Sequence, residues 1–99
     1  MTAMDGSLVN VAGTFKDSSG ALLDPDEIFI AYRFGVGGIA TKQYGVGGEV
    51  VRESLGKYSL NIDTTGQGGE VCYYRVYSTG DGQAAGEGLF QIRKSKVLN

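Results

Sequence analysis

Apolar and polar residues alternate in short segments along this chain, and glycine-rich turns separate the segments. In residues 8–16, for example, Val9, Val11 and Phe15 fall on one side of an extended backbone. A two-residue repeat is typical of a strand with one buried face, and no window of about ten residues keeps the 3.6-residue repeat of a helix. The 17 glycines against a single proline also favour many tight turns. The sequence therefore predicts an all-β fold.

About seven short strands follow from this alternation, at a spacing of roughly ten residues that is typical of a sandwich or small barrel. They are expected at 8–16, 28–34, 39–44, 50–53, 56–63, 71–78 and 89–93. A chain of 99 residues has room for one domain with one core. We therefore expect a loose N-terminal lead-in over 1–7, a single domain over 8–93 and a short basic tail over 94–99.

The segment Gly-Val-Gly-Gly occurs twice, at 35–38 and 45–48, each time after an aromatic residue. Paired glycines supply the positive φ angles that tight hairpin loops need. We expect the two copies to be hairpin loops on either side of the strand at 39–44. Two copies are too few for a solenoid, which needs at least three repeats.

The expected strand at 71–78 is apolar on both of its sides, so its register is ambiguous. One side carries Cys72, Tyr74 and Val76, and the other carries Tyr73, Arg75 and Tyr77. If the first set packs inward, the second set forms an exposed stripe of tyrosine and arginine. These residue types are enriched where proteins bind one another. Tyr73, Arg75 and Tyr77 are therefore the candidate interface residues.

The chain has no histidine and one cysteine, Cys72. This composition excludes a histidine-based catalytic triad, a zinc site built from histidine and cysteine, and an internal disulfide. Without a histidine to activate its thiol, Cys72 is expected to be a buried structural residue rather than a nucleophile. We predict no catalytic residues, no cofactor and no metal site, and the chain is not expected to be an enzyme.

Charge and hydropathy narrow the expected partners. The formal net charge of −2 argues against nucleic acid as the main partner. No apolar run approaches the roughly 18 residues of a membrane-spanning helix. The first residues also lack the basic and apolar regions of a secretory signal. Neither nucleic acid nor a membrane is therefore expected as a partner.

Two further motifs admit a second interpretation. Residues 80–85 match the G-x-G-x-x-A pattern of dinucleotide-binding loops, but the required helix and second strand do not follow, which favours a hairpin loop. An acidic cluster could bind Ca²⁺ through its carboxylates. The cluster consists of Asp17, Asp24, Asp26 and Glu27. Because the spacing of an EF-hand is absent, the pattern favours a turn that Asp24 caps and Pro25 restrains.

A glycine and a tyrosine lie two positions apart at Gly56 and Tyr58, within the segment S-L-G-K-Y-S-L at 54–60. This segment resembles the D-x-G-x-Y-x-C signature of immunoglobulin-like domains. The resemblance implies a tyrosine corner, in which the phenol bonds to backbone a few residues upstream and restrains the turn. Leu60 stands in place of the signature's cysteine, so the resemblance implies a core held by packing rather than by an inter-sheet disulfide.

Several short motifs occur in order between residues 8 and 95. They are SGALLDP at 19–25, YR at 32–33, YG at 44–45, VV at 50–51, GKYSLNID at 56–63, GEVCYYR at 69–75, STG at 78–80 and AAGEGLF at 84–90. This ordered set resembles a family of small immunoglobulin-like proteins encoded in the genomes of tailed bacteriophages. Cys72 departs from the family's pattern because a core tryptophan is usual at that position, and the change removes buried aromatic volume.

The family resemblance implies an immunoglobulin-like β-sandwich and a structural role without catalysis. Such a protein is a component of the virion, assembled in the host cytoplasm, whose partners are capsid or other virion proteins. It would dock in many symmetric copies on the capsid, as decoration or stabilisation, or at the head–tail junction. The alternative is an extracellular adhesion or carbohydrate-binding module, which would normally carry an export signal.

Overall fold

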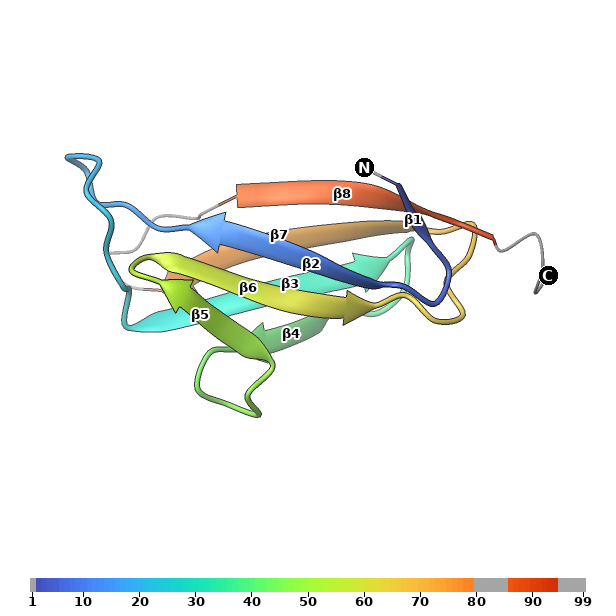
Figure 1. The fold of residues 1–99 in the computed structure, drawn as a ribbon, viewed down its shortest axis with the longest axis horizontal. Coiled ribbons are helices and arrows are strands. Elements are labelled where there is room, and N and C mark those ends of the chain that lie inside the picture. The colour runs from blue at the N-terminus through green and yellow to red at the C-terminus, as the bar shows by residue number, and fades with distance from the viewer. Residues whose placement is uncertain (1, 80–85, 95–99) are drawn as a thin grey trace.

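A computed structural model describes residues 2–79 and 86–94 of the chain. Eight strands make up the regular secondary structure of these ranges (Figure 1). They are β1 (Thr2–Met4), β2 (Leu8–Thr14), β3 (Glu27–Phe34), β4 (Ala40–Gln43), β5 (Val50–Ser54), β6 (Lys57–Asp63), β7 (Val71–Thr79) and β8 (Gly86–Arg93). The predicted all-β class is confirmed.

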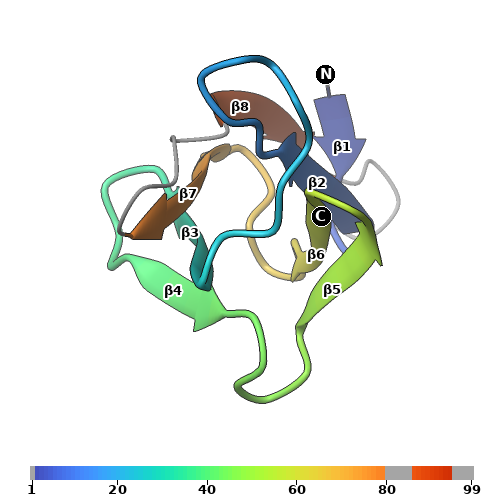
Figure 2. The same cartoon turned by 90° about the vertical axis from the view of Figure 1, so that its left-hand side faces the viewer.

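The strands form two sheets that lie one over the other, as the view along the strands shows (Figure 2). The larger sheet has the order β1-β8-β7-β3-β4, and the smaller sheet has the order β2-β6-β5. Neighbouring strands are antiparallel except for β1 and β8, which are parallel. The chain passes from one sheet to the other at several connections, so strands that follow each other in the sequence often lie in different layers.

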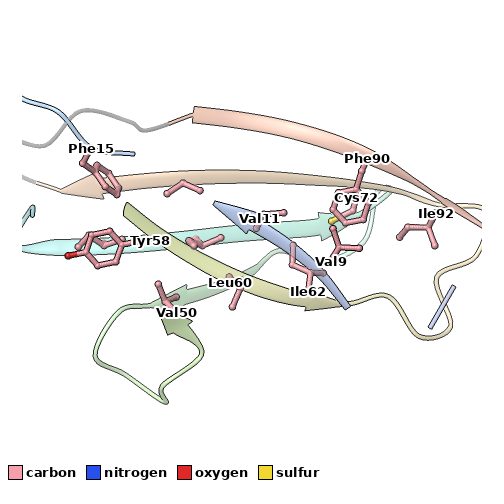
Figure 3. Packing of buried hydrophobic residues seen from close by; sticks show 13 residues of the cluster. Val9, Val11, Phe15, Val50, Tyr58, Leu60, Ile62, Cys72, Phe90 and Ile92 are labelled. Carbon is pink, nitrogen blue, oxygen red and sulfur yellow. The ribbon is translucent and has the colours of Figure 1, made fainter. Parts of the chain in front are cut away.

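Apolar side chains from both sheets fill the space between the layers (Figure 3). The core consists of Val9, Val11, Phe15, Ile28, Ile30, Val50, Tyr58, Leu60, Ile62, Cys72, Val76, Phe90 and Ile92. The exposure of its side chains shows which side of β7 faces the core. Cys72 and Val76 are 0% and 1% exposed, whereas Tyr73 is 42% exposed. The side of β7 that carries Tyr73 therefore faces outward, as one of the two predicted registers requires.

The two Gly-Val-Gly-Gly segments have different roles. The first, at 35–38, joins β3 to β4, which pair with each other as a hairpin. The second, at 45–48, joins β4 in the larger sheet to β5 in the smaller sheet. The prediction of a second hairpin was wrong because glycine permits a tight loop but does not select the next strand's partner. That partner is β6, and the pairing of Val50 with Leu60 buries both side chains in the core.

The N-terminal residues expected to be a loose lead-in include a short strand. Residues 2–4 form β1 and pair with β8, with Thr2 opposite Gln91. Ala3 packs against the core. Directly after β1, the Asp5 carboxylate accepts hydrogen bonds from the backbone N–H groups of Gly66 (2.9 Å) and Gly68 (3.1 Å). Three residues are too few to show alternation, so this strand depends on tertiary contacts that the sequence pattern does not reveal.

Tyr58 is buried as the corner prediction requires, but its surroundings differ from a tyrosine corner. Its hydroxyl donates to Oδ1 of Asp24 at 3.0 Å, and not to a backbone group just upstream. The turn at 55–56 joins β5 to β6 within one sheet, whereas a tyrosine corner follows a passage between sheets. The predicted partner and position of the corner were therefore wrong, while Gly56 and Tyr58 remain central to a different structure.

The Asp24 carboxylate is the centre of a group of hydrogen bonds. We call this group the Asp24 hub and define it by Asp24, Arg52, Gly56 and Tyr58. Oδ1 of Asp24 also accepts from the Gly56 N–H at 2.8 Å, and its Oδ2 accepts from Nη2 of Arg52 at 2.9 Å and from Nε at 3.2 Å. The Arg52 side chain, followed by the Gly56 N–H, lowers the pKa of the Asp24 carboxyl. The hub joins the β2–β3 connection to the β5–β6 turn.

Gly56 lies in close contact with the backbone of the β2–β3 connection. Its φ angle is +72°, and its backbone oxygen accepts from the N–H of Phe15 at 2.7 Å. A Cβ atom at position 56 would lie 2.8 Å from the carbonyl oxygen of Phe15 and 3.0 Å from that of Leu23. Both neighbours are backbone atoms, so they cannot move aside as a flexible side chain would.

We predict that Gly56→Ala destabilises the fold much more than Gly48→Ala. Gly48 has a similar φ of +75°, but no atom lies within 4 Å of its would-be Cβ. Gly48→Ala should therefore cost only the left-handed backbone strain, about 1 kcal/mol. Gly56→Ala adds the clash and should cost about 3 kcal/mol or more. Denaturant unfolding measures both values, and equal losses would contradict the close fit at Gly56.

We also predict that the Asp24 hub makes the fold acid-sensitive. Because the folded-state pKa of Asp24 is lowered from 3.8, its stabilisation is present above the unfolded-state pKa and is lost as the pH falls through the folded-state value. Asp24→Asn should therefore lower the Tm at neutral pH, and the gap to wild type should narrow as the pH falls below 3.8. Thermal melts across this range test the prediction, with Asp26→Asn as the control. A gap that is independent of pH would contradict it.

Candidate binding face

The outer face of the five-stranded sheet carries the predicted interface residues. We call it the Tyr/Arg face and define it by Phe29, Ala31 and Arg33 of β3, Thr41 of β4, Tyr73, Arg75 and Tyr77 of β7, and Glu87 and Leu89 of β8. Strand pairing places Arg33 opposite Tyr73 and Phe29 opposite Tyr77. These residues point outward because each alternates with an inward residue on its strand.

Cation–π contacts organise the centre of this face. The guanidinium carbon of Arg33 lies 5.6 Å from the ring centre of Tyr73, and that of Arg75 lies 5.1 Å from the ring centre of Tyr77. The Tyr77 ring also stacks on Phe29, with 5.3 Å between ring centres and 19° between ring planes. Such contacts restrain the long arginine side chains while leaving N–H groups for a partner.

The face is hollowed at its centre. An open groove of about 570 Å³ runs over the small side chain of Ala31, and its walls include Arg33, Tyr73 and Arg75. Beyond the groove, Leu89 is 56% exposed on β8. The face therefore combines apolar surface with two guanidinium groups, the composition that protein interfaces favour.

Negative charge is sparse on this face. Glu87 lies opposite Arg75, and its Oε1 is 3.7 Å from the Arg75 Nε. Both side chains are mostly exposed, so water weakens this ion pair. Among the residues that the structure describes, Arg33 has no ion-pair partner. The centre of the face thus carries two guanidiniums and one carboxylate.

The outer face of the smaller sheet has a different character. Asn10 donates from Nδ2 to Oδ1 of Asn61 at 3.0 Å across β2 and β6. Ser59 is buried, and its hydroxyl donates to Oε1 of Glu53 at 2.6 Å. These polar groups bond to one another, and although Leu8 and Val51 are also exposed on this side, the two cation–π pairs lie on the Tyr/Arg face.

The predicted interface residues Tyr73, Arg75 and Tyr77 lie side by side on one outer face. The sequence pattern did not identify Arg33 as an interface residue. The missing information was the pairing of β3 with β7, which brings Arg33 beside Tyr73. Alternation within one strand carries no information about which other strand lies next to it.

The acidic residues considered for Ca²⁺ have other roles. Asp24 belongs to the Asp24 hub. Oδ1 of Asp17 accepts hydrogen bonds from the backbone N–H groups of Ser19 and Ala21 and from the Ser19 hydroxyl, which lowers the Asp17 pKa. Across 2–79 and 86–94, no three histidine, cysteine, aspartate or glutamate side chains form a group that could hold a metal ion. The G-x-G-x-x-A segment at 80–85 and the tail beyond residue 94 lie outside the described residues.

Comparisons with known protein families, with curated proteins and with solved structures found no match for this chain. In the part of the chain that the structure covers, no helix is long and apolar enough to cross a membrane.

We predict that the Cys72 thiol is protected in the folded protein. Cys72 is fully buried between the sheets, and this burial raises its pKa to about 11. Since thiolate is the reactive form, labelling with a thiol reagent near neutral pH requires the fold to open. The reaction should be at least about 100-fold slower than in guanidinium chloride. Absorbance of the released thiol dye measures the rate, and similar rates in both conditions would contradict the burial of Cys72.

Proposed function

We propose that this chain is a non-enzymatic, immunoglobulin-like structural module of a tailed-phage virion, and that it docks through its Tyr/Arg face. The strand orders support the immunoglobulin-like part. In such folds, strand F lies between C and G in one sheet, while B, E and D are neighbours in the other. β7 lies between β3 and β8, and β2, β6 and β5 are neighbours in the same manner.

The Asp24 hub supports the phage-family resemblance. Two of the motifs that carry the resemblance are the D-P pair at 24–25 and the G-x-Y motif at 56–58. These motifs are far apart in the sequence, but Asp24 accepts hydrogen bonds from both Gly56 and Tyr58. A physical coupling of this kind gives a reason for the two motifs to occur together, which isolated matches would lack.

The exposed Tyr/Arg face is the observation that carries the docking role. Tyrosine and arginine supply much of the energy at protein interfaces when their side chains are already ordered. Here the rings of Tyr73 and Tyr77 restrain the guanidiniums before any partner arrives. A rigid surface of this kind can bind a partner without catalytic chemistry.

The size of the face favours attachment in many copies. β3, β7 and β8 are eight or nine residues long, so at about 4.8 Å between strands and about 3.3 Å per residue they span roughly 400 Å² of sheet. A stable interface usually buries about 800 Å² on each partner. One copy should therefore bind weakly, and repeated attachment to a symmetric shell would raise the overall affinity.

We predict saturable binding to phage heads that lack the protein. Purified protein should co-sediment with tailless heads of the encoding phage at a copy number that matches capsid symmetry. Tyr73→Ala and Arg75→Ala should each weaken binding by about tenfold, because each removes an interface side chain. Leu55→Ala is the matched control, since Leu55 is also exposed but lies in the β5–β6 turn.

Other outcomes are equally informative. A few copies per particle, lost when the tail is removed, would indicate the head–tail junction instead of capsid decoration. Equal binding by wild type, Tyr73→Ala and Arg75→Ala would rule out the Tyr/Arg face as the docking site. An absence of binding to any particle, together with binding of the isolated protein to oligosaccharides, would replace the virion role with a carbohydrate-binding one.

A further inference from the structure

We propose that the groove over Ala31 receives a carboxylate side chain from an acidic polypeptide segment, held between Arg33 and Arg75. This inference rests on the proposed docking function, because it names the chemistry of the partner at the same face. It commits to an acidic segment flanked by apolar residues and does not require a particular virion protein.

The two arginines occupy a diagonal pair of positions on neighbouring strands. Arg33 pairs with Tyr73, and Arg75 pairs with Ala31. Such diagonal neighbours lie roughly 7–8 Å apart at their backbones. Arg33 lies over Tyr73, whereas Arg75 leans along its own strand over Tyr77. The two guanidiniums therefore lean toward opposite ends of the face, and both arginines line the same groove as the small side chain of Ala31.

Charge in the groove favours an anionic occupant. Arg33 has no ion-pair partner within the described ranges, and Arg75 has only the loose contact with Glu87 at 3.7 Å. A guanidinium held over a tyrosine ring by a cation–π contact still has N–H groups that can donate to a carboxylate, in the best case in a bidentate arrangement. A carboxylate over Ala31 would neutralise positive charge that the described residues compensate only through the loose Arg75–Glu87 contact.

A polypeptide fits this groove better than a nucleic acid does. Single-stranded nucleic acids bind by stacking bases on available aromatic rings. The Tyr77 ring already stacks on Phe29 and contacts Arg75, and the Tyr73 ring contacts Arg33. Leu89 beside the groove instead offers contact to apolar side chains of an acidic segment.

The test uses the full chain and a fluorescein-labelled peptide of alternating glutamate and valine. A matched peptide carries glutamine in place of glutamate, and a labelled oligothymidylate represents nucleic acid. Fluorescence anisotropy at low salt should show about 5- to 10-fold tighter binding of the glutamate peptide than of the glutamine peptide. Added salt should reduce this difference, because the contact is partly exposed to water.

Substitutions then locate the contact. Arg33→Gln and Arg75→Gln should each weaken glutamate-peptide binding by about fivefold while leaving the Tm nearly unchanged, since both side chains are exposed. Arg33→Lys should recover only part of the loss, because lysine keeps the charge but lacks the bidentate geometry. Lys57→Gln is the control, since it removes a positive charge from the other sheet.

Equal binding of the glutamate and glutamine peptides would overturn the inference, and so would unchanged binding by Arg33→Gln and Arg75→Gln. Tighter binding of oligothymidylate than of the glutamate peptide would replace the polypeptide with a nucleic acid. The docking function and the binding of a carboxylate can be contradicted independently. If the protein sediments with phage heads but does not bind the glutamate peptide, the docking function stands and the carboxylate site is wrong. If the protein binds the peptide through both arginines but binds no phage particle, only the virion function is wrong.

Discussion

The carboxylate of Asp24 joins the connection that leads into the larger sheet to the β5–β6 turn of the smaller sheet. It lies in the connection that carries the chain from β2 in the smaller sheet to β3 in the larger one. Its hydrogen bonds with Arg52, Gly56 and Tyr58 attach this connection to the β5–β6 turn. Since β3 begins immediately after the connection, the Asp24 hub helps to set where β3 enters the larger sheet and therefore what its outward side chains meet.

Binding properties then follow from core packing. Ile28 and Ile30 of β3 and Cys72 and Val76 of β7 are buried between the sheets. Alternation along each strand turns the intervening side chains outward, and antiparallel pairing places the arginine of β3 beside a tyrosine of β7. The same packing that stabilises the fold thus assembles a rigid surface on its outside. The surface is small, so we expect it to act through repetition rather than through the strength of a single contact.

Local patterns in the sequence predicted every strand except β1 and much of the core, because side-chain alternation is a property of each strand alone. Relations between distant segments were not predictable in this way. Alternation within β3 does not show that Tyr73 lies beside Arg33. The second Gly-Val-Gly-Gly segment shows a loop but not that the loop crosses between sheets. The sequence pattern predicts that the Tyr58 ring is buried. It does not predict that the Tyr58 hydroxyl donates to Asp24, because Asp24 is distant in the sequence.

Hydroxyl-radical footprinting of the protein bound to phage heads tests the central claim most directly, because it reports the exposure of individual side chains. Tyr73 and Leu89 are 42% and 56% exposed in the free protein, and Val51 and Leu55, both 48% exposed, lie away from the Tyr/Arg face. Binding should protect Tyr73 and Leu89 from oxidation while Val51 and Leu55 stay reactive. Protection of Val51 and Leu55 with unchanged oxidation of Tyr73 and Leu89 would contradict it.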